Sequence, residues 1–309
     1  MPIVIIRNDH KTMAWKEALL KADPELEIYA HDEEHDPERI TMAIVWKPPH
    51  GVLSHYPNLG AIASFGAGVD FLFEENSLPE GVPITRVVDP VLAADMSEFV
   101  TAVILAQLKN LLVFKHIQPN KKWLPMEYRR ISEVSVGIMG LGELGCRLAV
   151  DLVRFGFKVR GWARSEKDID KVSCFAGEQG LTSFLSGTDL LVCLLPLTPD
   201  TRGILNKGLF MKLPEGAYVI NVARGGHLEE DDLLEVLEQG HLSGAFLDVF
   251  SREPLPEDHP FWQHPKIDMS PHVASVSDVN SVVPQLLDNY YRLQEGQPLK
   301  NQVSTSRGY

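Results

Sequence analysis

The chain has 309 residues, which is long for a single hydrophobic core and suits two domains. Hydrophobic residues make up 44% of it and charged residues 23%, as is ordinary for a globular protein. The formal net charge of −13 argues against nucleic acid or an anionic membrane as a partner, because the average field of the protein repels both. A small anionic substrate would need locally placed cations, so single arginines become candidates.

The cysteines and the N-terminal segment indicate the cellular compartment in which the protein is expected. Three cysteines, Cys146, Cys174 and Cys193, are too few and too scattered for a disulfide framework, and no CxxC or His/Cys cluster indicates a metal. The first apolar run covers only residues 2–6, too short for a signal-peptide core or a membrane span. We therefore expect packing thiols, no metal and a cytoplasmic protein.

The first third of the chain alternates short apolar runs with helical or turn segments. This alternation predicts a parallel sheet with crossover helices, and so a small α/β domain. Near the C-terminus, residues 278–295 predict an amphipathic helix, kinked by Pro284, that could return to this domain. The apolar runs lie at residues 2–6, 26–30, 43–46, 61–65 and 84–88.

A long apolar helix is expected next. Asp95 and Glu98 have the spacing of a capping box, which predicts that the helix begins there. Residues 99–114 are apolar nearly all round, which indicates burial on more than one face. The helix would lie in a core or be shared between domains or subunits. Residues 118–130 are polar and broken by prolines, which predicts a connection or an arm.

Residues 134–145 read VSVGIMGLGELG. The apolar run predicts a buried strand, and Gly140, Gly142 and Gly145 predict a tight turn into a helix. The free amides at the start of that helix, including those of Glu143 and Leu144, would face a pyrophosphate. A GxGxxG pattern alone is a weak signal, because glycine turns between strands and helices are common.

The following segments strengthen the dinucleotide interpretation. Apolar runs and helical patterns alternate after the glycines, which predicts a second, larger doubly wound sheet between about residues 98 and 278. Its helices are expected at residues 143–155, 207–213 and 230–239. Its later strands are expected at residues 157–163, 190–195, 217–222, 245–250 and 267–269.

The residues after the second strand of this unit indicate which dinucleotide cofactor binds. An NAD-binding unit places an acid about 20 positions after the glycines, on the ribose 2′-hydroxyl. Here the strand runs into Arg164 and Ser165 with no acid at its tip. Arg164 could pair with a 2′-phosphate, with Ser165 and Lys167 as further donors. This predicts NADPH (NADP+), with NADH as the weaker alternative; the other readings are a surface arginine, or Glu166 acting as a displaced acid.

Three later strands each run into a chemically active residue. Arg224, Glu253 and His272 follow the runs at 217–222, 245–250 and 267–269, and the carboxyl ends of such strands form the binding edge of a doubly wound sheet. A guanidinium can bind a carboxylate and polarise the adjacent carbonyl. An imidazolium can protonate the carbonyl oxygen as hydride arrives, and a neighbouring carboxylate favours the charged imidazole. The set predicts reduction of a 2-oxo acid.

Together these motifs resemble the D-isomer-specific 2-hydroxyacid dehydrogenases over nearly the whole chain. The resemblance implies an α/β fold of two doubly wound parallel-sheet domains and, by the habit of the family, a homodimer. Residues 98–278 would form the NAD(P)-binding Rossmann domain, and residues 1–97 plus 279–309 a smaller flavodoxin-like substrate domain. The similarity rests on GLGELG (140–145), Leu195-Pro196, NVARGG (221–226), LDVFSREPLP (247–256) and SPHVA (270–274).

The resemblance also assigns roles to residues. Arg224 would orient the substrate, His272 would donate the proton, and Glu253 would be its acidic partner. The loop from Ser64 to Asp70 would hold the substrate carboxylate through its amides, and Trp46 would either wall the pocket or sit in the core. The implied substrate contacts in that region are Trp46, Gly66, Ala67 and Gly68, and the further cofactor contacts are Leu195, Pro196, Val222, Ala223, Asp248 and Ser275.

Within the family, the chain is most similar to the branch that reduces glyoxylate and hydroxypyruvate. The matching segments are residues 45–49, 95–98 and 162–165 and the Arg-Gly-Tyr ending. This implies NADPH-dependent reduction of glyoxylate to glycolate and of hydroxypyruvate to D-glycerate. The alternatives are an NAD-linked D-2-hydroxyacid dehydrogenase for another 2-oxo acid, and a dinucleotide-sensing binding protein on the same fold.

Overall fold

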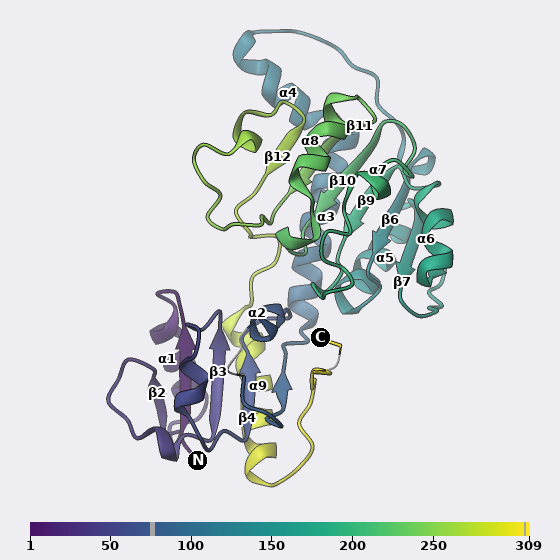
Figure 1. Ribbon diagram of the computed structural model, residues 1–309. Helices are drawn as coiled ribbons and strands as arrows, with labels where there is room; N and C mark the ends of the chain where they lie inside the picture. Colours follow the sequence, from purple (N-terminus) through teal and green to yellow (C-terminus); the bar gives the residue numbers. More distant parts are fainter. Residues whose placement is uncertain (75–77, 306) are drawn as a thin grey trace. The chain divides into compact units, whose positions relative to one another are not determined.

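The computed structural model describes residues 1–74, 78–305 and 307–309. It divides into two compact units. The first unit comprises Met1–Leu92 and Ser277–Tyr309, and the second unit comprises Ala93–Val276. Each unit is a parallel sheet with helices on both faces (Figure 1).

The first unit contains a five-stranded sheet in the order β2-β1-β3-β4-β5, with every pairing parallel. This is the flavodoxin-like strand order. The strands are almost wholly buried, as expected when helices cover both faces. The strands are β1 (Ile3–Arg7), β2 (Ile28–Ala30), β3 (Met42–Trp46), β4 (Ala61–Ser64) and β5 (Ile84–Thr85), and the helices are α1 (Thr12–Ala22), α2 (Asp70–Phe73) and α9 (Val279–Gln294).

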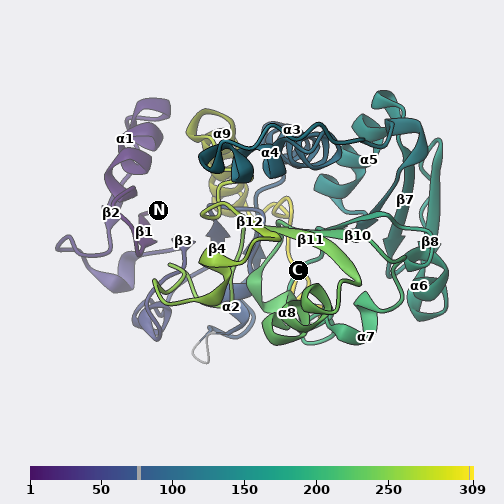
Figure 2. The same ribbon diagram turned by 90° about the horizontal axis from the view of Figure 1, so that it is seen from above.

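Two separate apolar clusters fix the layers of the first unit. Side chains of α1 and α9, such as Leu19 and Leu286, pack on one face of the sheet. Leu72 of α2 and Leu53 pack on the other face. Figure 2 shows α1 and α9 on the side of this sheet opposite to α2. Pro284 lies inside α9, which nevertheless continues to Gln294.

The second unit contains a seven-stranded parallel sheet in the order β12-β11-β10-β9-β6-β7-β8. Starting from β6, the strands build outward in both directions, which is the doubly wound Rossmann arrangement with its switch point between β6 and β9. The predicted fold class is confirmed for both units. The strands are β6 (Ser135–Met139), β7 (Lys158–Ala163), β8 (Val172–Ala176), β9 (Leu190–Cys193), β10 (Ala217–Asn221), β11 (Leu242–Leu247) and β12 (Ile267–Met269).

Helices cover both faces of this sheet as well. Val100 and Leu148, of α3 and α5, belong to the cluster on one face. Phe184, Phe210 and Leu233, of α6, α7 and α8, belong to the cluster on the other, as Figure 2 shows. The helices are α3 (Pro90–Leu108), α4 (Leu111–Ile117), α5 (Glu143–Phe155), α6 (Gly177–Leu185), α7 (Lys207–Phe210) and α8 (Glu230–Glu238).

The long apolar helix begins and ends earlier than predicted. α3 starts at Pro90, and Asp89 accepts a hydrogen bond from the amide of Val91 at 3.0 Å, so an N-cap Asp followed by Pro is the true start signal. The expected capping box at residues 95–98 lies inside the helix and caps nothing. Asn110 adopts a left-handed conformation (φ 57°) that separates α3 from α4.

By length and composition α3 could cross a membrane, with a mean hydropathy of 1.6 over an 18-residue window. Its buried residues Val100 and Ile104 pack instead into the same apolar cluster as Ile138 and Ile220 of the sheet. The core helix of a globular domain meets the same length and hydropathy criteria. The apolar character of α3 is therefore accounted for by its packing on the sheet.

In the second unit, β8 and α6 were missing from the sequence-based prediction, and one helix is shorter than expected. β8 is an edge strand whose residues are only partly buried, so its sequence lacks the apolar run that marks the central strands. α6 follows it directly and buries only Phe184 and Leu185. α7 ends at Phe210 rather than continuing to residue 213.

The glycine turn supplies a prediction about folding. A Cβ at Gly145 would lie 1.9 Å from the carbonyl oxygen of Gly140, whereas a Cβ at Gly142 meets nothing within 4 Å. Gly145→Ala should therefore lower the free energy of unfolding by about 3 kcal/mol or more, because the helix must move away from the strand. Gly142→Ala, at an ordinary φ of −84°, should lower it by less than about 1 kcal/mol.

Urea denaturation followed by circular dichroism measures both variants. Equal unfolding midpoints for the two would contradict the close contact between α5 and the turn after β6.

Candidate active site

The glycine turn leaves backbone amides exposed above the end of β6. Gly140 has φ +104°, and a Cβ there would lie 2.6 Å from the carbonyl oxygen of Leu194. The helical hydrogen bond from Cys146 to Gly142 spans 2.8 Å, so the preceding amides, including those of Glu143 and Leu144, have no partner within α5. An open cradle of amides at a helix N-terminus fits a pyrophosphate.

Arg164 and Ser165 follow β7 directly, and Lys167 comes two residues later; all three are exposed. β7 pairs with β6, the strand that precedes the glycine turn. No acid stands at the tip of β7. The segment after β7 thus offers two cations and a hydroxyl, which suit a phosphorylated ribose, and it also contains Glu166, the displaced acid of the alternative interpretation.

At the end of β10, a buried asparagine shapes the segment that carries Arg224. Asn221 is fully buried, and its amide accepts a hydrogen bond from the backbone of Ala223 (3.2 Å) and donates one to the carbonyl of Arg224 (2.9 Å). The guanidinium of Arg224 donates through Nη1 to the carbonyl oxygen of Ala223 at 2.7 Å. A Cβ on Gly225 would lie 1.8 Å from the carbonyl carbon of Phe250, so this loop touches the one that follows β11.

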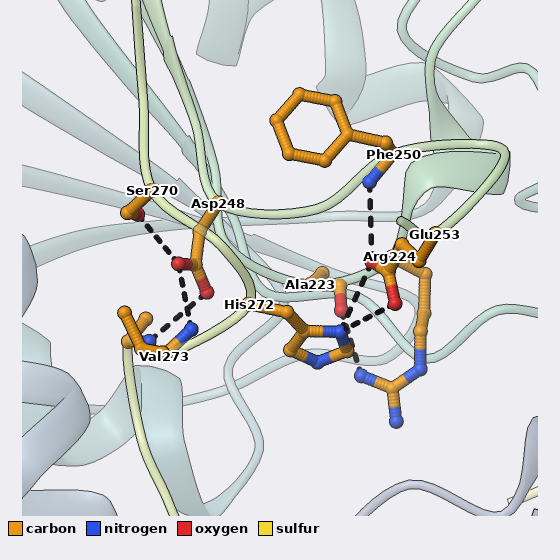
Figure 3. A network of polar contacts seen from close by, with 9 residues as sticks. Ala223, Arg224, Asp248, Phe250, Glu253, Ser270, His272 and Val273 are labelled. Atoms are coloured by element: carbon orange, nitrogen blue, oxygen red, sulfur yellow. Dashed lines mark hydrogen bonds and ion pairs between the residues drawn. The ribbon is translucent and has the colours of Figure 1, made fainter. Parts of the chain in front are cut away.

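Asp248, just after β11, organises the loop that follows β12. Its carboxylate is 1% exposed and accepts hydrogen bonds from Ser270 Oγ (2.5 Å) and from the amides of Val273 (2.8 Å) and Ala274 (3.0 Å). Its carbonyl accepts the amide of His272 at 2.7 Å. Figure 3 shows this carboxylate directed into the loop. The cofactor contact that the resemblance implies for Asp248 stays a prediction, and these partners make the residue the support of the His272 loop as well.

His272 and Glu253 form the pair that the sequence suggested. Nδ1 of His272 lies 3.0 Å and 2.9 Å from the two carboxylate oxygens of Glu253. With Nδ1–H directed at the carboxylate, Nε2 is the nitrogen left to face a substrate. Figure 3 shows the imidazole of His272 turned toward the carboxylate of Glu253. Both side chains of the pair are only partly buried, at 29% and 24% exposure.

A second carboxylate anchors the loop that carries Glu253. Glu230, in the first turn of α8, accepts from Ser251 Oγ at 2.8 Å and lies 3.2 Å from Nε2 of His259. The backbone amide of Phe250 also donates to Glu253 at 3.3 Å. The carboxylate that faces His272 is therefore presented by a loop held at both of its ends.

The remaining predicted cofactor contacts follow other strand ends of the second unit. Leu195 and Pro196 come after β9, and Val222 and Ala223 come after β10. Ser275 lies just beyond the loop that Asp248 holds. β9 is the strand next to β6, so Leu195 and Pro196 lie near the switch point where dinucleotides bind in this fold.

The predicted substrate loop belongs to the first unit and follows β4. Ser64 Oγ accepts from the amide of Gly66 (3.1 Å) and lies 3.3 Å from the carbonyl of Gly68, so the loop closes on its own serine. A Cβ on Gly66 would lie 2.4 Å from the Trp46 ring. Trp46 is only partly buried and packs edge-on against Phe71. Its ring lies against the predicted loop.

The three thiols are unsuited to nucleophilic chemistry. Burial raises the pKa of Cys193 to about 12 and also raises the pKa values of Cys146 and Cys174. The thiols are therefore protonated near neutral pH. Among residues 1–74, 78–305 and 307–309, no group of three or more His, Cys, Asp or Glu side chains could hold a metal ion.

Sequence reasoning missed the residues that support the site. Asn221 lies inside a quoted motif but was given no role, and His227 was one of eleven histidines with nothing to distinguish it. Glu230 lies in a run of acids at the start of α8. A polar residue at the end of an otherwise apolar strand is the one signal that could have indicated Asn221, because burial there requires hydrogen-bond partners.

The chain matches known proteins over its full length. Residues 101–274 match the model of the D-isomer specific 2-hydroxyacid dehydrogenase NAD binding domain. A glyoxylate/hydroxypyruvate reductase A from Serratia proteamaculans is 40% identical over 314 residues, covering 100% of both proteins. A protein of the same name from Yersinia enterocolitica is 40% identical over 279 residues, covering 89% of each.

Solved structures agree. A D-isomer specific 2-hydroxyacid dehydrogenase from Xanthobacter autotrophicus Py2, in complex with NADPH and MES, superposes with a TM-score of 0.95 at 40% identity, covering 100% of this chain and 99% of the other. An NADPH-dependent glyoxylate/hydroxypyruvate reductase from Sinorhizobium meliloti, in complex with NADP and sulfate, gives 0.93 at 38% identity, with the same coverage. The chain therefore belongs to the D-isomer specific 2-hydroxyacid dehydrogenase family.

Proposed function

We propose that the protein is an NADPH-dependent reductase that converts glyoxylate to glycolate and hydroxypyruvate to D-glycerate. The observation that carries this proposal is the pairing of His272 with Glu253 at 2.9 Å, on adjoining strand ends of a Rossmann sheet that also presents Arg224. The family and the names of the relatives support the same chemistry.

The proton comes from His272. Glu253 holds Nδ1 and stabilises the charged imidazole, so that Nε2–H can protonate the oxygen of a 2-oxo group. When bound, the reduced nicotinamide supplies the hydride. The protein's own task is to place the carbonyl and to neutralise the negative charge that develops on its oxygen.

The substrate is held by its carboxylate. Arg224 presents a planar guanidinium that can bind the carboxylate and polarise the adjacent carbonyl. The amides of Gly66, Ala67 and Gly68 are further donors, in a loop closed by Ser64. We assign Trp46 to the wall of the pocket, because its partly exposed ring lies against Gly66.

The cofactor is held by the second unit, residues 93–276, and the first unit acts as the substrate domain. The turn from Gly140 to Gly145 would cradle the pyrophosphate. Arg164, Ser165 and Lys167 would bind the 2′-phosphate. The nicotinamide end would lie by Leu195, Pro196, Val222, Ala223 and Ser275, with Asp248 acting through the loop it supports.

The protein is expected to be a homodimer. Apolar side chains are exposed on α4 and on the segment that follows it, which is unusual unless a partner covers them. The segment contacts Lys109 through the ring of Tyr128, whose centroid lies 3.8 Å from Nζ. The exposed fractions are 56% for Leu111, 95% for Trp123, 54% for Leu124, 38% for Met126 and 60% for Tyr128.

A cytoplasmic location is the proposal most consistent with the three free, protonated thiols, since an oxidising compartment favours paired cysteines. Fractionation of the source cells tests it. Activity found mainly outside the cytoplasmic fraction would overturn it.

A matrix of initial rates tests the proposed function. We expect the highest kcat/KM for NADPH with glyoxylate or hydroxypyruvate, and lower values for NADH and for pyruvate or phenylpyruvate. His272→Ala is the matched control for reductase activity that comes from contaminating proteins. Its kcat should fall by roughly 10²- to 10⁴-fold, the usual contribution of a positioned proton donor. The Kd for NADPH should change little.

Other results would change the assignment. A preference for a larger 2-oxo acid with NADH would identify a different dehydrogenase of this family. Tight NADPH binding without turnover of any 2-oxo acid would favour a dinucleotide-sensing protein. Full activity in His272→Ala would remove this residue from the proton-donor role.

The 2′-phosphate assignment has its own test. Arg164→Asp should lower kcat/KM with NADPH by roughly 10- to 100-fold, because a charge-assisted hydrogen bond is replaced by repulsion. The value with NADH should change by less than about threefold. Lys158→Asp makes the same change of charge at the other end of β7 and should spare both cofactors. Equal losses with NADPH and NADH would disprove the assignment.

The dimer is tested by light scattering after size-exclusion chromatography. We expect the mass of two chains for the wild type and of one chain for Trp123→Glu, because burying a carboxylate in an apolar contact is unfavourable. Trp262→Glu, at a side chain 55% exposed outside this patch, is the control and should stay dimeric. A monomeric wild type would overturn the proposal.

A further inference from the structure

His227 is a fully buried histidine whose two ring nitrogens face two different loops. It lies in the short turn Gly225–His227 after β10 and is 0% exposed. Nδ1 lies 3.1 Å from the carbonyl oxygen of Arg224, and Nε2 lies 3.3 Å from that of Pro196. Both partners are acceptors, so a charged imidazole donates to both and a neutral one to either. The charged ring therefore links the two carbonyls by two hydrogen bonds, whereas the neutral ring bonds to one of them and only contacts the other.

On one side the ring reaches the residue assigned to the substrate. The carbonyl of Arg224 also accepts the backbone amide of His227 (3.3 Å) and the side-chain amide of Asn221 (2.9 Å). Three hydrogen bonds on one carbonyl hold the backbone from which the guanidinium extends. Two of the three come from His227.

On the other side the ring reaches the loop that follows β9. The carbonyl of Pro196 accepts from Thr201 Oγ1 at 2.7 Å as well as facing Nε2 of His227. Thr201 Oγ1 in turn accepts the amide of Thr198 at 2.9 Å. Pro196 is therefore held from within its own loop by Thr201, and from the neighbouring loop by the imidazole.

We propose that His227 is a positioning residue that couples the backbone of Arg224 to the cofactor loop at Pro196. This inference rests on the proposed function, in which Arg224 binds the oxo acid and Pro196 borders the nicotinamide. Hydride transfer requires the carbonyl carbon and the nicotinamide to be held in register, and small displacements lower the rate strongly. With a proton on each nitrogen, the buried ring is hydrogen-bonded to both loops and maintains that register without touching either reactant.

The two loops are also joined by backbone hydrogen bonds, so they should stay together when the ring is changed and its role can be tested separately. Backbone hydrogen bonds join Gly203 to Gly226 (3.0 Å) and Leu205 to His227 (2.8 Å). These bonds do not depend on the side chain at residue 227. A substitution at residue 227 removes the contacts of the ring to Arg224 and Pro196. It leaves the backbone hydrogen bonds between the two loops in place.

Two variants each keep half of the link. The amide nitrogen of Asn can take the place of Nδ1, and that of Gln can take the place of Nε2. His227→Asn should therefore keep the contact to Arg224 and lose that to Pro196, and His227→Gln should do the reverse. The readouts are the Kd for NADPH from cofactor fluorescence, and KM and kcat for glyoxylate.

We expect a split between the two variants. His227→Asn should raise the Kd for NADPH about tenfold and leave the KM for glyoxylate within about twofold, as expected for one lost hydrogen bond. His227→Gln should raise the KM for glyoxylate about tenfold and leave the Kd for NADPH within about twofold. Both should lower kcat. His227→Gln should thus keep the Kd for NADPH near its wild-type value, and His227→Asn should do the same for the KM for glyoxylate.

A structural role alone predicts a different pattern. His241 also packs inside the second unit, with Nε2 2.9 Å from the carbonyl of Phe210, and His241→Asn should lower Tm without separating the two constants. If both His227 variants lowered Tm and changed Kd and KM in parallel, or changed neither constant, the inference would be overturned. Circular dichroism at the assay temperature confirms that each variant is folded.

Failure of the inference on His227 can be distinguished from failure of the proposed function. If the wild type turns over no 2-oxo acid, the proposed function fails. The Kd for NADPH still tests the link to Pro196 in that case: a selective rise in His227→Asn supports it, and equal values for the two variants overturn it.

Discussion

The buried carboxylate of Asp248 is the constraint on which the candidate active site depends. A charge removed from water must be satisfied by hydrogen bonds, and its donors come from Ser270, Val273 and Ala274. The loop after β12 must therefore fold back over the end of β11. That course places His272 at a φ of 54°, a conformation that few residues other than glycine adopt. The carboxylate compensates for local strain at the residue that would donate the proton.

A close backbone contact also fixes the loop after β10 against the loop after β11. Gly225 has no room for a side chain against Phe250, so the loop with Arg224 and the loop with Glu253 lie in direct contact. Glu230 fixes the second of these loops from α8. The reacting groups thus sit on short loops, and each loop is tied to a rigid element by a buried or partly buried polar side chain.

Much of this arrangement could be predicted from the sequence, because parallel strands bring their carboxyl ends to one edge. The apolar runs located the central strands, and the residues after them identified Arg224, Glu253 and His272. The edge strand β8 and the helix α6 were not predicted, because many of their residues are partly exposed. Their sequences therefore lack a clear apolar run. The start of α3 was misplaced because the spacing of Asp95 and Glu98 resembles a capping box, whereas Asp89 and Pro90 form the actual start.

The supporting roles of other residues were missed for a different reason. Asn221, Asp248 and His227 act through carbonyls and amides that are distant in sequence or that have no side-chain signature. Residues 221 and 224 meet only because the strand ends between them, and residues 196 and 227 meet only because β9 and β10 are neighbours in the sheet. Partners of this kind follow from the fold, and a single sequence does not reveal them.

The exposure of Arg164, Ser165 and Lys167 has a consequence for the evolution of cofactor use. Substitutions at exposed positions usually change the free energy of unfolding by less than about 0.5 kcal/mol, whereas Gly140 and Gly145, in the turn after β6, are confined by nearby backbone atoms. The part of the site that would distinguish NADPH from NADH can therefore vary at almost no cost in stability, while the part common to both cofactors cannot. A lineage on this scaffold could change its source of reducing equivalents by a few surface mutations and keep its catalytic loops intact.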